Sequence, residues 1–166
     1  MCHRLFRDAE GNNEITESDI VIPMLSNGWK KIDGKWYYYI NGDLATGWQK
    51  ISGKWYYLGT DGIMRTGWQK VGKNWYYLNS SGVMQTGWMK YGTKWYYLGT
   101  NGIMRTGWQK ISSKWYYLLS SGAMVTDWKQ INGVWYYFAK SGVMVTGTQF
   151  INGKQYTFSA SGALVG

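Results

Sequence analysis

Short runs of aromatic and β-branched residues alternate with turn residues along the chain after residue 27. In the segment GWQKISGKWYYLGTDGIMRT (47–66), two such runs flank Ser52-Gly53, and a second turn lies near Asp61-Gly62. Two β-prone runs joined by two turn residues predict a β-hairpin. No part of 28–166 has a helical period of apolar positions, so these residues are expected to be all-β.

The segment recurs along the chain, so residues 28–166 are organised as tandem repeats. A first tryptophan follows glycine, or aspartate in the sixth unit, at Trp29, Trp48, Trp68, Trp88, Trp108 and Trp128. A second tryptophan comes seven residues later and opens a Trp-Tyr-Tyr triplet, at Trp36, Trp55, Trp75, Trp95, Trp115 and Trp135. The units are 28–46, 47–66, 67–86, 87–106, 107–126, 127–146 and a degenerate last unit, 147–166.

A single hairpin is marginally stable in water, so units of this kind must stack on one another. The predicted fold is therefore a β-hairpin solenoid of about seven repeats of 19–20 residues, in which the last unit is a cap. Residues 1–27 have no comparable pattern and are read as a cap, a linker or the remnant of a missing domain.

Pairing across the Asp33-Gly34 turn predicts the faces of the hairpin. It sets Trp29 opposite Tyr38 and Lys31 opposite Trp36, so both tryptophans and the third triplet residue share one face. The middle tyrosine and the isoleucine before the turn share the other face. The last unit has Thr148, Gln155 and Thr157 on the first face and keeps Ile151, Tyr156 and Phe158 on the second. The second face is therefore expected to stack, and the first to bind a ligand. A purely structural aromatic core is the alternative.

Composition and charge narrow the classes of function. One Cys and one His exclude an internal disulfide and a zinc site, and no apolar stretch approaches the roughly 20 residues of a membrane span. The first residues lack the pattern of a signal peptide. The net charge is +9, with −3 in residues 1–27 and therefore +12 in 28–166, which points to an anionic partner.

Two indoles, a phenol ring and a methionine thioether form an electron-rich cage that suits a quaternary ammonium group, and choline recognition is a known use of aromatic cages. One cage is expected to bind weakly, but several cages on one polymer gain avidity of about 100- to 10,000-fold. Lysines two residues after the first tryptophan could attract a phosphate on the ligand. They are Lys31, Lys50, Lys70, Lys90 and Lys110.

At this point the pattern GWQKISGKWYYLGTDGIMRTGW resembles the choline-binding repeats of bacterial surface proteins and cell-wall lytic enzymes, over residues 28–166. The resemblance implies a left-handed superhelix of hairpins that holds phosphocholine on teichoic and lipoteichoic acids at the bacterial cell surface. The chain is expected to have no cofactor, no nucleic-acid partner and no membrane span, and a homodimer is left open.

The resemblance also implies that a site uses two tryptophans of one repeat, an aromatic residue of the next and often a methionine. The expected inner groups are Trp48, Trp55, Met64 and Tyr77; Trp68, Trp75, Met84 and Tyr97; Trp88, Trp95, Met104 and Tyr117; and Trp108, Trp115, Met124 and Tyr137. The expected end groups are Trp29, Trp36 and Tyr57, with Leu44 in the methionine place, and Trp128, Trp135, Met144 and Tyr156.

Three other functions compete with choline binding. The last unit is similar to repeats that bind glucans, and single-stranded nucleic acid would also suit a basic, aromatic surface. Choline-binding repeats also occur behind peptidoglycan-cutting domains, so this chain could be the anchoring part of a lytic enzyme. Its own repeats offer only Asp33, Asp43, Asp61 and Asp127 as carboxylates, and Cys2 and His3 stand in the first segment, so no catalytic role is expected.

Overall fold

The computed structural model describes residues 6–7, 14–15 and 27–166, which are all-β. The expectations for residues 1–27, including Cys2 and His3, concern a segment that lies mostly outside the described residues. No helix long and apolar enough to cross a membrane occurs within the described ranges.

Seven hairpins follow one another between residues 28 and 158, after a short pair formed by β1 (Phe6–Arg7) and β2 (Glu14–Ile15). The hairpin strands are β3 (Gly28–Ile32) with β4 (Lys35–Ile40), β6 (Gly47–Ile51) with β7 (Lys54–Leu58), β8 (Gly67–Val71) with β9 (Asn74–Leu78), β10 (Gly87–Tyr91) with β11 (Lys94–Leu98), β12 (Gly107–Ile111) with β13 (Lys114–Leu118), β14 (Asp127–Ile131) with β15 (Val134–Phe138), and β16 (Gly147–Ile151) with β17 (Lys154–Phe158). A further strand, β5 (Asp43–Leu44), pairs with β4. The predicted all-β class and the tandem hairpins are confirmed, whereas the left hand of a superhelix stays a prediction.

The predicted pairing register is also confirmed. Trp29 lies opposite Tyr38 and Lys31 opposite Trp36, and the later hairpins repeat this arrangement. The turn dipeptides set it, because a two-residue turn whose residues both have positive φ matches the twist of the strands. Asn152 and Gly153, for example, have φ of 51° and 79°.

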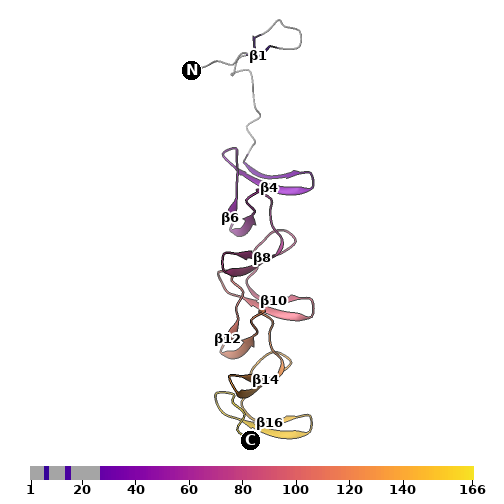
Figure 1. Cartoon of the computed structure of the whole chain (residues 1–166), viewed down its shortest axis with the longest axis vertical. Coiled ribbons are helices and arrows are strands. Elements are labelled where there is room, and N and C mark those ends of the chain that lie inside the picture. Colours follow the sequence, from indigo (N-terminus) through magenta and orange to yellow (C-terminus); the bar gives the residue numbers. More distant parts are fainter. Residues whose placement is uncertain (1–5, 8–13, 16–26) are drawn as a thin grey trace. The chain divides into compact units, whose positions relative to one another are not determined.

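The chain comprises two compact units, Met1–Arg65 and Thr66–Gly166, and each is described by itself. The first unit contains β1 to β7 and the second contains β8 to β17. Figure 1 shows the five hairpins of the second unit in sequence order. Each of these hairpins is a separate two-stranded sheet, so no ladder of strand hydrogen bonds runs from one hairpin to the next.

Successive hairpins within a unit are joined by a backbone hydrogen bond that recurs. The N–H of Met104 donates to the carbonyl of Trp75 in the preceding hairpin at 2.8 Å, and Met124 donates to Trp95 at 2.7 Å. The same methionine also pairs with the last strand residue of its own repeat, as Met104 does with Leu98. That last residue is the centre of each small core, since the side chains of Leu78, Leu98, Leu118 and Phe138 are 0% exposed.

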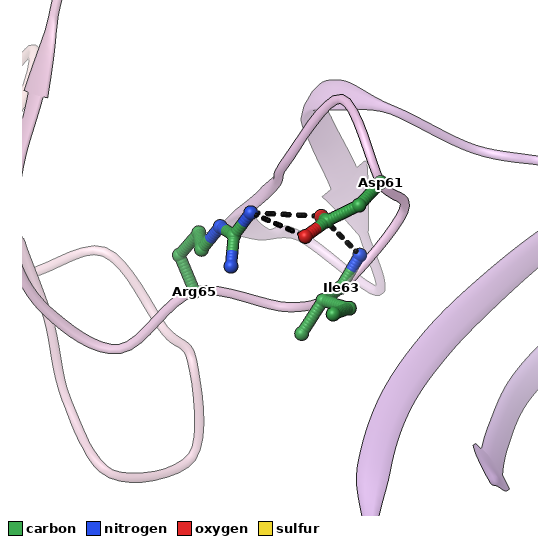
Figure 2. A network of polar contacts seen from close by, with 3 residues as sticks. All are labelled: Asp61, Ile63 and Arg65. Atoms are coloured by element: carbon green, nitrogen blue, oxygen red, sulfur yellow. Dashed lines mark hydrogen bonds and ion pairs between the residues drawn. The ribbon is translucent and has the colours of Figure 1, made fainter.

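The turn that leads from one repeat to the next is held by local polar contacts. In the first unit, a carboxylate oxygen of Asp61 accepts a hydrogen bond from the N–H of Ile63 at 3.1 Å, and both of its carboxylate oxygens lie 2.8 Å from Arg65 Nη2 (Figure 2). The amide hydrogen bond, followed by the ion pair, lowers the pKa of Asp61 from its ordinary value. Asn101 and Arg105 repeat the arrangement without the carboxylate.

Candidate functional site

The first tryptophan of each repeat is the hub of an aromatic cluster. The ring of Trp108 lies 6.2 Å from Trp115 and 5.2 Å from Tyr117 in its own hairpin, and 4.9 Å from Tyr136 in the next hairpin. All three ring pairs meet edge to face, which is a favoured geometry for aromatic contacts. Strand alternation explains this, because Trp108, Trp115 and Tyr117 share one face, whereas Tyr136 projects from the opposite face of the next hairpin.

These clusters border open hollows in the unit Thr66–Gly166. A hollow of about 340 Å³ is lined by two tryptophans of one repeat, the middle tyrosine and methionine of the next, and a serine from the turn of the repeat after that. The residues are Trp108, Trp115, Tyr136, Met144 and Ser161. Two further hollows have the same plan: Trp88, Trp95, Tyr116, Met124, Lys140 and Ser141 around about 330 Å³, and Trp68, Trp75, Tyr91, Tyr96, Met104, Ser120 and Ser121 around about 410 Å³.

The methionine connects three repeats at each hollow. Met104 bonds through its backbone to Trp75, and its side chain lines the hollow between Trp75 and Tyr96. The same side chain packs against Gly122 in the following turn, where an added Cβ would overlap the Met104 sulfur. Gly122 also has a φ of +82°, which L side chains rarely adopt. Met104 is thus both a wall of the hollow and the support of the turn that brings Ser120 and Ser121 to it.

The structure departs from the expected grouping in the choice of tyrosine. The middle tyrosine of the next triplet approaches the first tryptophan to 4.8–5.1 Å in the pairs Trp29–Tyr56, Trp68–Tyr96, Trp88–Tyr116, Trp108–Tyr136 and Trp128–Tyr156. The third tyrosine, which was expected there, packs on the first tryptophan of its own hairpin, because the two lie directly opposite each other on one face. These residues are Tyr57, Tyr77, Tyr97, Tyr117 and Tyr137. The expected choice of Tyr156 at the end site agrees with the geometry.

The methionines are also displaced by one repeat from the expected grouping. Met104, Met124 and Met144 line the hollows of Trp68, Trp88 and Trp108, rather than those of Trp88, Trp108 and Trp128. The reason is the path of the chain, since the segment after the second turn runs back to the second tryptophan of the preceding hairpin. The equivalent backbone hydrogen bond runs from the N–H of Met64 to the carbonyl of Trp36 in the first unit, and from the N–H of Leu164 to the carbonyl of Trp135 in the second. The end group with leucine is therefore that of Trp128 and Trp135, and not that of Trp29 and Trp36. Met84, expected beside Trp68 and Trp75, packs instead against Gly102 of the following turn.

The remaining tryptophan pairs are brought together as expected. Ring centroids are 6.4 Å apart for Trp29 and Trp36, 6.5 Å for Trp48 and Trp55, and 6.4 Å for Trp128 and Trp135.

Comparisons with known proteins agree with this repeated cluster. The family described as Choline-binding repeat matches residues 65–105 and 125–166, and the family described as Putative cell wall binding repeat matches 27–43, 46–64 and 106–124. The chain belongs to the choline-binding repeat family. No match was found among curated proteins.

Solved structures of choline-binding proteins share the fold. Choline binding protein F of Streptococcus pneumoniae, crystallised in the presence of a peptidoglycan analogue, is 47% identical with a TM-score of 0.82, over 84% of this chain and 52% of that one. CbpJ of the same species is 48% identical with a TM-score of 0.81 and the same coverage. A pneumococcal cell wall endolysin from phage Cp-1, complexed with choline, is 38% identical with a TM-score of 0.53, over 73% of this chain and 37% of that one. The chain thus spans about half the length of the first two.

Lysine side chains lie beside the exposed second tryptophan of several choline-binding repeats. The Nζ atoms of Lys31, Lys50 and Lys110 are 5.8–6.0 Å from the ring centroids of Trp36, Trp55 and Trp115, which lie across the hairpin. Lys140 contributes a further positive charge, because it lines the hollow of Trp88 and Trp95. Part of the basic charge of the repeats therefore lies beside the aromatic surface.

Sequence reasoning missed the residues that the second turn brings to each hollow, Ser120, Ser121, Lys140, Ser141 and Ser161, because they come from two repeats further along the chain. It also missed Tyr91. The available signal was its position, where the other six repeats have Ile or Val. Within the described ranges, no group of His, Cys, Asp and Glu is placed to hold a metal ion.

Proposed function

We propose that the chain is a non-catalytic attachment module that binds phosphocholine groups of teichoic and lipoteichoic acids on the bacterial cell surface, one group in each hollow. The observation that carries the proposal is the hollow built from two indoles, a phenol ring and a thioether, and repeated with the same plan at Trp68, Trp88 and Trp108. Such a cage attracts a quaternary ammonium ion through the negative faces of its rings.

Polymer binding follows from the number of hollows. A single cation–π contact contributes about 0.5–2 kcal/mol, so one hollow alone binds choline in roughly the millimolar range. A polymer that carries choline at intervals can occupy several hollows at once, and its apparent affinity rises by about 100- to 10,000-fold. Phosphate next to the ammonium group suits the lysines beside the rings, above all Lys140.

Tryptophan fluorescence during titration with choline tests the proposal directly. We expect a saturable change with choline, and none with maltotetraose or a short oligonucleotide at equal ionic strength. Trp115→Gln removes one exposed ring and is expected to lower the number of bound choline molecules by one, because Gln155 occupies the equivalent place in a hairpin that retains the same fold. Fluorescence that stays constant with choline would overturn the proposal, and a response to the sugar alone would assign the module to glucans.

The lysine at one hollow allows phosphate recognition to be measured separately. Lys140→Ser is expected to reduce the preference for phosphocholine over choline at the Trp88 hollow by about two- to fivefold, the range of an exposed ion pair. Ser120→Lys places a lysine at the equivalent position of the Trp68 hollow and is expected to raise the preference there. Equal preferences in all three proteins would contradict this role.

A further inference from the structure

The three hollows of the unit Thr66–Gly166 differ at one wall. The last residue of the first hairpin strand is Ile or Val in six repeats and Tyr91 in the fourth; the others are Ile32, Ile51, Val71, Ile111, Ile131 and Ile151. Tyr91 ends β10, where it pairs with Lys94. An aromatic residue at this place is therefore a peculiarity of one repeat and not a part of the repeated pattern.

In the last two repeats the aliphatic residue at this place, Ile131 or Ile151, belongs to the core between two hairpins. Ile131 is 7% exposed and packs in a cluster with Phe138 and Met144, against which Trp108 and Tyr117 of the preceding hairpin lie. Tyr91 faces the equivalent pair of the preceding hairpin, since its ring lies 6.2 Å from Trp68 and 5.7 Å from Tyr77. A phenol ring is longer than an isoleucine side chain, so it extends beyond the core.

The extended ring reaches the hollow. Tyr91 is 50% exposed and lines the space together with Trp68, Trp75 and Tyr96, so four aromatic rings surround it. The hollows of Trp88 and Trp108 are lined by three rings each. The volume with Tyr91 is also larger, about 410 Å³ against about 330 and 340 Å³. The additional ring thus adds a wall and does not fill the space.

We propose that Tyr91 is an affinity-determining residue that makes the hollow of Trp68 and Trp75 the tightest quaternary ammonium site of this unit, and the first to be occupied. The proposal rests on the proposed function. A fourth ring adds one cation–π contact at a partly exposed site, which corresponds to a dissociation constant about two- to fivefold lower than at the neighbouring hollows. The sites of this module are then unequal, and at low choline concentration the hollow of Trp68 and Trp75 has the highest occupancy.

The test follows each hollow separately by fluorine NMR of the full chain labelled with 5-fluorotryptophan, whose signals are assigned by single Trp→Phe variants. During titration with choline, the signals of Trp68 and Trp75 are expected to reach their midpoint at a two- to fivefold lower concentration than those of Trp88 and Trp108. Tyr91→Ile restores the residue found in most other repeats, so the fold is expected to be kept and the difference to disappear. Ile111→Tyr places the ring at the Trp88 hollow and is expected to lower the midpoint there.

Tyr91→Phe separates the ring from its hydroxyl group, and the low midpoint is expected to remain. Equal midpoints in the wild type, an unchanged Trp68 midpoint in Tyr91→Ile, or a Tyr91→Phe variant that behaves like Tyr91→Ile would each overturn the role of the Tyr91 ring. In all three cases the signals still respond to choline, so the proposed function stands. A complete lack of response at every tryptophan would instead refute the proposed function.

Discussion

The hairpins β14–β15 and β16–β17 keep one face in common and differ in the other. Toward the preceding hairpin, both present an isoleucine 7% exposed, a middle tyrosine and a phenylalanine 0–2% exposed: Ile131, Tyr136 and Phe138 in one, and Ile151, Tyr156 and Phe158 in the other. On the opposite face, Trp128, Trp135 and Tyr137 are replaced by Thr148, Gln155 and Thr157, yet the pairing register is unchanged.

This difference separates the requirements of folding from those of binding. The face toward the preceding hairpin is constant because it forms the buried core of each junction. At the last hairpin the face with the tryptophans is exchanged for polar residues without loss of the hairpin, whereas in earlier hairpins this face also packs on the next junction, as Trp108 does on Phe138. The two tryptophans of the six other repeats are therefore not needed for the hairpin itself, and they serve the hollow and the junction with the next hairpin.

The largest effect is expected from removal of the buried phenylalanine. Phe138→Ala should lower the free energy of unfolding by about 3–5 kcal/mol, because it leaves a cavity in the centre of a junction. Phe150→Ala is the matched control, since Phe150 is 75% exposed, and should change stability by less than about 0.5 kcal/mol. Urea unfolding measured by circular dichroism gives both values. Equal losses of unfolding free energy in the two variants would show that both faces contribute equally to stability.

The second effect concerns the support of the turn by methionine. Gly122→Ala forces a Cβ onto the Met104 sulfur, whereas Gly133→Ala, at almost the same φ, meets no atom within 4 Å. Both variants carry the backbone strain, so the excess loss in Gly122→Ala, expected at about 1–3 kcal/mol, reports the contact with Met104. In Gly122→Ala, the hollow of Trp68 should also bind choline more weakly than in the wild type, because Met104 lines it. A stability equal to that of Gly133→Ala would argue against this coupling.

A gain of stability is expected at the one hairpin turn among the described residues 28–158 that has positive φ at both residues but no glycine. Ser112 and Ser113 have φ of 49° and 64°, at the positions where the last hairpin has Asn152 and Gly153. Ser113→Gly should raise the free energy of unfolding by about 1 kcal/mol, because the left-handed conformation strains a residue with a Cβ. Ser81→Gly serves as the control at a turn residue whose φ is not positive, and it should bring no such gain. A lower melting temperature for Ser113→Gly would contradict the interpretation.

The smallest effect concerns acid stability. The pKa of Asp61 is lowered in the folded chain, so its contribution is complete above the ordinary carboxylate pKa of about 4 and is lost as the pH falls through the lowered value. Asp61→Asn gives this turn the same residue as Asn101 in the equivalent turn. Its melting temperature should fall slightly less between pH 6 and pH 2 than that of the wild type. An identical loss in both proteins would show that Asp61 does not contribute to acid sensitivity.

The sequence was sufficient to predict the hairpins, their register and the sorting of side chains between two faces. These follow from turn residues and strand alternation, as at Asp33-Gly34, and both are local. It was not sufficient to predict which tyrosine or methionine completes a hollow. Alternation places Tyr96 and Tyr97 on opposite faces, but it does not say which face is turned toward Trp68. The place of Met104 depends on the path of the chain between hairpins, which no local pattern contains.

Each of the three hollows takes its walls from three consecutive repeats, such as Trp68, Tyr96 and Ser120. Duplication of the coding sequence preserves such an arrangement only when it adds complete repeats. Insertion of one complete unit of 20 residues preserves every junction and supplies one new hollow, whereas an insertion of another length shifts tyrosine, methionine and turn out of phase with the tryptophans. The number of ligand groups held by the module can therefore change by unequal recombination alone, without substitution of any side chain that forms a wall.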